Sequence, residues 1–123
     1  MTGTSLIIIA HGSRRQQSND EVRQLALQIE QHTHERFTSV CCAFLELAEP
    51  DIPTAIERAI AAGGSELHLV PYFLSAGRHV AHDIPEIVEQ KRQQHPNINI
   101  HLDDHLGSAP GMAQLVLDQL DSA

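Results

Sequence analysis

A short run of apolar residues, SLIIIA at positions 5–10, most limits how this chain can fold. A continuous run of this length, with three consecutive isoleucines, predicts a β-strand that is buried on both faces. Further strands are predicted at 40–47, 66–74 and 97–102, the last of which alternates polar and apolar residues as an edge strand does. A strand that is buried on both faces needs cover on both sides, so the pattern indicates a layered α/β protein.

Segments with helical periodicity separate the four predicted strands. Ser18 and Glu21 have the spacing of a capping box, which predicts a helix from this point to about Phe37. The other helices are predicted from Pro50 and Asp51 to Gly63, from about Asp83 to His95, and from Pro110 onward. The chain therefore alternates strand and helix along its whole length.

This alternation predicts the topology of the sheet. Strands joined by helices of about ten residues or more pair in parallel, because a parallel crossover needs that length. We expect a single doubly wound α/β domain at 1–123, with a mainly parallel four-stranded sheet in the order 2-1-3-4 and helices on both faces. The topological switch point then falls between the first and third strands, beyond whose carboxyl ends such sheets bind ligands.

Composition excludes several classes of protein. The net charge of −8 argues against nucleic acid and membrane as partners, because both need a basic surface. No apolar run approaches the length of a membrane span or a signal peptide, so we expect a cytoplasmic protein. Cys41 and Cys42 are adjacent within an apolar run, which favours two packed side chains over a disulfide or a metal site.

Histidines and a glutamate follow three of the predicted strands. His11 ends the first strand, Glu46 lies near the end of the second, and His79 follows the third through a short loop. Carboxyl ends of parallel strands meet at one edge of the sheet, so these side chains are expected to lie close together. Imidazole and carboxylate suit iron, cobalt, nickel or zinc, and three protein ligands leave positions on the metal open.

Each of these residues also has a simpler explanation. A loop carbonyl could satisfy His11, and Glu46 precedes a helix start, where the helix dipole favours a carboxylate. Only their joint placement favours a metal site. His101, Asp103 and His105 are a secondary set on one face of the last strand, and His82 is expected to be exposed near a helix start. The remaining histidines are expected to be incidental: His32, His34, His68 and His95.

An anion site is the alternative at the first strand end. Gly12 and Ser13, with Arg14 and Arg15, could cradle a phosphate near a helix amino end. However, the chain has neither a Walker motif nor GxGxxG, and Ala10 stands where histidine phosphatases carry an arginine before His-Gly. A phosphohydrolase is therefore weaker than metal chemistry, and a metal carrier that uses the same histidines stays open.

Three stretches resemble a known family. AHGSRRQQSN at 10–19, AFLELAEPDI at 43–52 and PYFLSAGRHVAHDIPEIV at 71–88 closely resemble the short form of the class II tetrapyrrole chelatases. The resemblance covers about the first 90 residues in register. It implies insertion of Co²⁺ or Fe²⁺ into sirohydrochlorin toward cobalamin or sirohaem, with Ni²⁺ as the alternative and no further cofactor. It also implies a homodimer, because longer members look like two tandem copies of this unit.

The family's functional residues match positions of this chain. Its two active-site histidines fall on His11 and His79, and its metal-contacting glutamate falls on Glu46. One histidine is expected to accept a pyrrole proton, since imidazole ordinarily titrates near pH 6.5. Ser13 is a further candidate for contact with substrate. The arginines expected to meet substrate carboxylates are Arg14, Arg15 and Arg78, although solvated loop charges are an equal alternative. The last helix could contribute to the dimer interface through Met112, Leu115, Val116 and Leu120.

Overall fold

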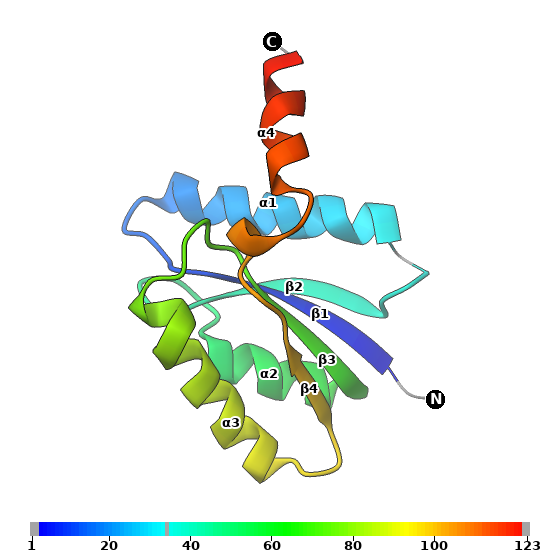
Figure 1. The fold of residues 1–123 in the computed structure, drawn as a ribbon. Helices are drawn as coiled ribbons and strands as arrows, with labels where there is room; N and C mark the ends of the chain where they lie inside the picture. Colours follow the sequence, from blue (N-terminus) through cyan, green and yellow to red (C-terminus); the bar gives the residue numbers. More distant parts are fainter. Residues whose placement is uncertain (1–2, 34, 122–123) are drawn as a thin grey trace.

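The predicted α/β sheet is confirmed by the computed structural model, which describes residues 3–33 and 35–121. Its four strands pair in parallel in the order β2-β1-β3-β4 (Figure 1). The strands are β1 (Gly3–Ala10), β2 (Ser39–Phe44), β3 (Gly64–Pro71) and β4 (Asn99–Leu102). The α-helices are α1 (Gln16–Thr33), α2 (Ile52–Ala61), α3 (Ile84–Gln94) and α4 (Met112–Asp121). Two short helical turns are η1 (His79–Asp83), which is π-helical, and η2 (Leu106–Ser108).

Apolar side chains alternate between the two faces of the sheet and build a core on each. Ile7 and Ile9 of β1 point toward α2 and α3, whereas Ile8 points toward α1. In Figure 1, α1 lies on one side of the sheet and α2 and α3 lie on the other. A fully buried isoleucine contributes about 1.5–3 kcal/mol relative to an exposed one, so β1 anchors both layers.

The start of α1 differs from the prediction. The helix begins at Gln16 and ends at Thr33, so Ser18 lies inside its first turn and the predicted capping box is wrong. The side chain of Asn19, which is buried, accepts a hydrogen bond from the Ser13 amide (2.9 Å) and donates one to the Ser13 carbonyl (2.8 Å). These two bonds fix the loop between β1 and α1, and the helix starts earlier than its sequence signal suggests.

Several strands are also shifted relative to their apolar runs. β2 ends at Phe44, three residues earlier than expected, because the Phe44 amide donates to the Pro50 carbonyl as the chain folds back toward α2. β3 begins at Gly64 and ends at Pro71, and β4 begins at Asn99. The predicted helix start at Asp51 is confirmed, since its side chain accepts a hydrogen bond from the Thr54 amide (2.8 Å).

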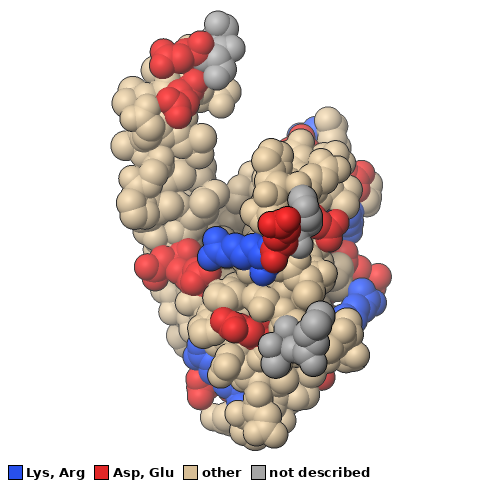
Figure 2. All heavy atoms as spheres, turned by 90° about the vertical axis from the view of Figure 1, so that its right-hand side faces the viewer, with Lys and Arg blue, Asp and Glu red and all other residues tan. Residues whose placement is uncertain are grey.

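Helix α4 leaves the body of the molecule. None of its residues is buried, and Figure 2 shows it as a column that projects away from the rest of the chain. The column lacks Lys and Arg and carries its acidic residues toward the chain end. In residues 3–33 and 35–121 no helix has both the length and the apolar character needed to cross a bilayer. The cytoplasmic location expected from the sequence stays a prediction.

Candidate metal centre

The backbone brings His11 and Glu46 together just beyond β1 and β2. The parallel pairing continues past both strands, because the Leu45 amide donates to the Ala10 carbonyl (3.0 Å) and the Glu46 amide to the His11 carbonyl (3.1 Å). Nε2 of His11 consequently lies 3.1 Å from Oε2 of Glu46, which is hydrogen-bond distance. Two residues that are 35 positions apart thus form one polar pair at the carboxyl edge of the sheet.

Gly12 makes this close approach possible. Its φ is +95°, a backbone conformation that residues with a side chain rarely adopt. A Cβ atom at this position would lie 1.8 Å from the Glu46 carbonyl oxygen. Only glycine therefore lets the segment after β1 pack against the segment after β2.

His79 completes the group from the far side of β1. Its ring meets the His11 ring edge to face, with 4.8 Å between the centroids and 74° between the planes. The sequence placed His79 in a loop, but it opens the π-helical turn η1, which leads directly into α3. π-Helical turns within helices frequently occur at functional sites. The three residues predicted from the strand ends are therefore neighbours in space.

Asp83 is a residue of this group that the sequence prediction missed. Its Oδ2 accepts a hydrogen bond from Nδ1 of His79 (2.7 Å), and this bond holds the pKa of the Asp83 carboxyl below its ordinary value of 3.8. An ionised carboxylate can only accept, so Nδ1 carries a proton, and in the neutral ring Nε2 of His79 then presents a free lone pair. The spacing of four residues between His79 and Asp83 was the available signal, because i and i+4 share a helical face.

The side chains of this group are accessible and are of the types that bind divalent metals. The side chains of His11, Glu46 and His79 are 47%, 54% and 43% exposed. Two imidazoles and one carboxylate suit a borderline divalent ion, and three ligands leave coordination positions for other groups. The arrangement fits a metal that is held and then handed on better than one that is enclosed.

Three arginines at the same edge have free guanidinium groups. Arg14, Arg15 and Arg78 are exposed, and none forms an ion pair with a carboxylate in the described part of the chain. By contrast, Arg23 on α1 pairs with Asp20 at 3.0 Å. The free arginines are available to bind anionic groups. The Ser13 hydroxyl already accepts a hydrogen bond from the Arg15 amide (3.0 Å), so it also stabilises the turn between β1 and α1.

Large apolar side chains are also exposed at the carboxyl edge, and the sequence prediction missed them. Leu47 directly follows Glu46, while Tyr72 and Leu74 follow β3, and they are 55%, 42% and 71% exposed. The backbone of Gly107 packs directly against the backbone of Leu74, because a Cβ atom added at Gly107 would lie 1.8 Å from the Leu74 carbonyl oxygen. Exposed apolar side chains beside free arginines suit a ligand with an apolar body and acidic substituents.

Other predicted residues lie elsewhere. Asp103 and His105 were predicted to share one face of the last strand with His101. They instead follow the end of β4, so the prediction is wrong for these two residues. His101 instead lies beside Glu66 and His68. The side chain of His82 is 68% exposed, as expected, and His34 lies outside the described residues.

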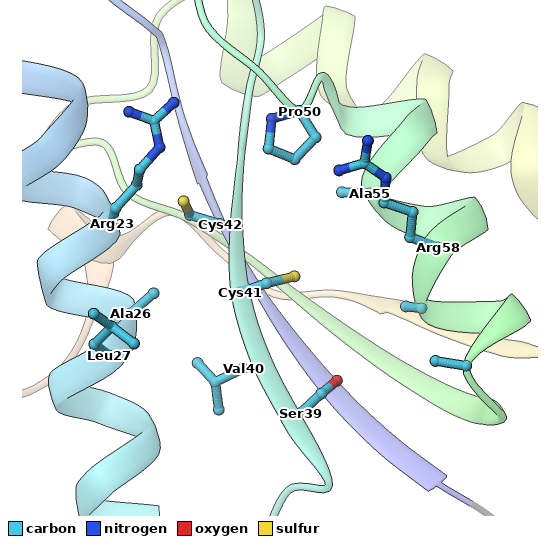
Figure 3. Close-up of a pocket in the computed structure, with 12 residues that line it drawn as sticks. Arg23, Ala26, Leu27, Ser39, Val40, Cys41, Cys42, Pro50, Ala55 and Arg58 are labelled. Atoms are coloured by element: carbon cyan, nitrogen blue, oxygen red, sulfur yellow. The ribbon is translucent and has the colours of Figure 1, made fainter. Parts of the chain in front are cut away.

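An apolar hollow of about 480 Å³ lies away from this group, along the edge of β2 between α1 and α2 (Figure 3). Arg23, Arg58 and both cysteines line it. Burial raises the pKa of the Cys41 thiol to about 11, and it also raises the pKa of Cys42. Both thiols are therefore protonated at neutral pH, as expected for side chains that only pack.

Comparisons with known proteins identify the family of the chain. The CbiX family profile matches residues 5–123. A sirohydrochlorin ferrochelatase from Priestia megaterium is 24% identical over 95% of this chain and 43% of its own length. A sirohydrochlorin cobaltochelatase from Methanocaldococcus jannaschii is 33% identical over 68% of this chain and 57% of its own. The chain thus spans about half the length of these curated relatives.

A solved structure shares the fold. The sirohydrochlorin chelatase SirB from Bacillus subtilis subspecies spizizenii, in complex with cobalt, superposes with a TM-score of 0.84 and 25% identity. The match covers 99% of this chain and 51% of SirB.

Proposed function

The chain belongs to the CbiX family, and we propose that it inserts a divalent metal ion, cobalt or iron, into sirohydrochlorin. The observation that carries the proposal is the group of His11, Glu46 and His79 at the switch-point edge of the sheet. The relatives named as sirohydrochlorin cobaltochelatase and ferrochelatase support this substrate. Nickel suits the same ligands, so it is the alternative metal substrate.

Metal capture would use the three side chains together. Nε2 of His79 is free to bind the ion, since Asp83 holds the other ring nitrogen. Nε2 of His11 faces Glu46 at 3.1 Å, so an arriving cation takes the place of the proton between them, which moves to Nδ1 of His11 through solvent, and two metal bonds replace one hydrogen bond. Only three protein ligands hold the ion, and the four ring nitrogens of the tetrapyrrole can take over its coordination.

Insertion also requires proton transfer. As the M²⁺ ion enters, two pyrrole N–H bonds break and two protons leave, so the charge of the macrocycle is unchanged. A histidine that releases the metal can accept one of these protons. Asp83 would stabilise the imidazolium of His79 through the bond to Nδ1. We therefore assign the pair of His79 and Asp83 to proton acceptance after metal transfer.

The edge around the metal group would bind the macrocycle itself. Arg14, Arg15 and Arg78 have no ion-pair partner among residues 3–33 and 35–121, and arginine forms bidentate pairs with carboxylates such as those on the ring periphery. Leu47 and Leu74 offer apolar contact to the ring face. The Ser13 hydroxyl is a further contact to substrate, with no cofactor required beyond the metal ion.

We further propose that a single domain of this kind, 1–123, acts as a homodimer. The chain matches about half of SirB and of the Priestia relative, so a second copy would supply the missing half. The exposed apolar side chains of α4 are the surface that a second copy would cover, and they are Leu115, Val116, Leu117 and Leu120. Replacing Leu115 by Glu should give a monomer in light scattering, whereas Leu27→Glu, at a similarly exposed position of α1, should stay dimeric. A monomeric wild-type protein would contradict this proposal.

An insertion assay tests the proposed activity. Purified protein with sirohydrochlorin and Co²⁺, Fe²⁺ or Ni²⁺, the Fe²⁺ sample kept anaerobic, should change the visible spectrum faster than buffer does. His11→Ala and His79→Ala should each abolish the acceleration. Metal binding without tetrapyrrole binding would instead support a metal carrier, and no acceleration with any of the three metals would rule out the chelatase.

A further inference from the structure

A second group of metal-ligand side chains lies on the sheet itself. Glu66 and His68 are two residues apart on β3, so they point to the same face, and His101 is the register partner of His68 on β4. The side chains between them, Leu67 and Ile100, point to the opposite face and are buried. The parallel pairing of β3 and β4, which Figure 1 shows as neighbours, therefore places one carboxylate and two imidazoles side by side.

The three side chains converge on one point. Oε1 of Glu66 lies 3.3 Å from Nε2 of His68 and 3.4 Å from Nε2 of His101. The two imidazole rings stack, with 4.6 Å between centroids and 15° between planes. All three ligand atoms lie within 4.8 Å of one another. One oxygen of the Glu66 carboxylate thus lies close to both histidine rings.

These distances match a metal site better than a pair of hydrogen bonds. N–H···O hydrogen bonds are usually about 2.7–3.2 Å long, with a maximum in frequency near 2.9–3.0 Å. Ligand atoms about 2.1 Å from a tetrahedral ion lie about 3.4 Å from one another. The two distances from the carboxylate, 3.3 and 3.4 Å, are close to this spacing.

The group is both supported and accessible. Its members belong to paired strands, which hold side chains more precisely than loops do. The Phe37 ring contacts the His68 ring edge to face at 6.1 Å and forms one wall. The side chains of Glu66, His68 and His101 are 45%, 27% and 47% exposed, so an ion can enter and keep water on its remaining positions.

We propose that Glu66, His68 and His101 form a second divalent-metal site, specific for borderline ions such as Co²⁺, Ni²⁺ or Zn²⁺. It is separate from the first, because His68 pairs with Leu6 of β1 and five residues of extended chain, roughly 16 Å, lead from there to His11. A macrocycle bound at the carboxyl edge does not reach this face. The ion instead ties the four-residue edge strand β4 to β3 and stabilises the sheet.

Counting bound metal tests this site without any tetrapyrrole. Calorimetric titration of the metal-free full chain with Co²⁺ should give two equivalents, and Co²⁺ should raise the melting temperature by several degrees. Glu66→Gln and His101→Gln should each bind one equivalent and lose most of the thermal shift. His11→Gln should also bind one equivalent but keep that shift, and His32→Gln, at an exposed position on α1, should bind two. Circular dichroism of the metal-free variants checks that each is folded.

The possible outcomes separate this site from the proposed activity. If Glu66→Gln and His101→Gln bind as much Co²⁺ as the wild type, or if the wild type binds a single equivalent that only His11→Gln removes, the second site is wrong. If the wild type binds one equivalent that Glu66→Gln removes, the second site stands and metal capture at His11 fails. Loss of insertion activity alone has no bearing on this stoichiometry.

Discussion

Two groups in this molecule have the same set of three ligands, two imidazoles and one carboxylate, yet the fold places them in different settings. His11, Glu46 and His79 lie beyond the strand ends, where three segments of the chain meet at the switch point. Glu66, His68 and His101 lie in the middle of two strands, on a flat face. Their histidine rings meet at 74° in the first group and at 15° in the second. We propose that the first group acts on a large substrate at the edge of the sheet and that the second binds only a metal ion.

We infer that position in the sheet, more than ligand type, separates a site for chemistry from a site for binding. The first group has a positioning carboxylate, Asp83, and exposed arginines and apolar side chains around it. The second has the rigid backbone of β3 and β4 and an aromatic wall from Phe37. The following changes are designed to disturb one group while leaving the other intact.

The largest effect is expected from Gly12→Ala. The added Cβ would meet the Glu46 carbonyl at 1.8 Å in a backbone with φ of +95°, so the first group must come apart. We expect a loss of about 3 kcal/mol or more in the free energy of unfolding, together with loss of insertion. Urea denaturation measures the first quantity. Gly77→Ala is the matched control, since a Cβ at Gly77 has open space around it, and equal losses in the two variants would contradict this explanation.

Asp83→Asn should have the next largest effect. An asparagine can no longer fix the His79 tautomer as a carboxylate does, and loss of such a partner typically costs about 10–100-fold in metal affinity or activity. Nitrogen-15 NMR of the histidine rings should show the ring proton of His79 on Nδ1 in the wild type. In the variant, this proton should be distributed between Nδ1 and Nε2. Glu86→Gln, three residues later on the same surface, should leave both readouts unchanged.

The pH dependence of this contact has a definite sign. Hydrogen bonding from His79 lowers the pKa of Asp83, so its stabilising contribution is complete above the ordinary value of 3.8. The contribution is lost as the pH falls through the lowered value. Wild type and Asp83→Asn should therefore still differ in stability at pH 5, which is above the ordinary value, and converge only in stronger acid. Convergence at pH 6 in denaturation experiments would show that this carboxylate is not the ionised partner.

A smaller effect is expected from Arg78→Gln. Its guanidinium is exposed and has no ion-pair partner in residues 3–33 and 35–121, so the variant should keep its stability. One charged contact to substrate is worth about 1 kcal/mol at an exposed edge, which corresponds to roughly a five-fold rise in KM with little change in kcat. Steady-state kinetics with sirohydrochlorin measure both constants. Arg36→Gln, far from this edge and stacked on Phe37, should not change KM.

Most of the sheet could be predicted from the sequence because burial on two faces leaves a clear pattern. The apolar run of β1 and the spacing of the strands were sufficient for the order β2-β1-β3-β4. Boundaries were less accurate, since side-chain contacts such as that of Asn19 with Ser13 determine where α1 begins. The direction of α4 could not be predicted either, because its apolar stripe does not pack on the described core.

The two groups differ in how far the sequence could predict them. His11 and Glu46 follow strands directly, so topology alone brought them together. His68 and His101 are 33 positions apart and meet only through the register of β3 with β4, which periodicity does not determine. Asp83 was missed because the π-helical turn η1 was taken as a loop, and a loop gives no reason to pair residues four positions apart.

The insertion rates of His11→Gln and His101→Gln, measured side by side with Co²⁺ and sirohydrochlorin, test the division between the two groups most directly. Each variant removes one imidazole from one group, and both positions are similarly exposed. We predict that His11→Gln slows insertion by about 100-fold or more, because it removes a metal ligand at the reacting centre, whereas His101→Gln stays within about two-fold of the wild type. Equal rates for the two variants, or a larger loss with His101→Gln, would contradict the assignment of insertion to the carboxyl edge of the sheet.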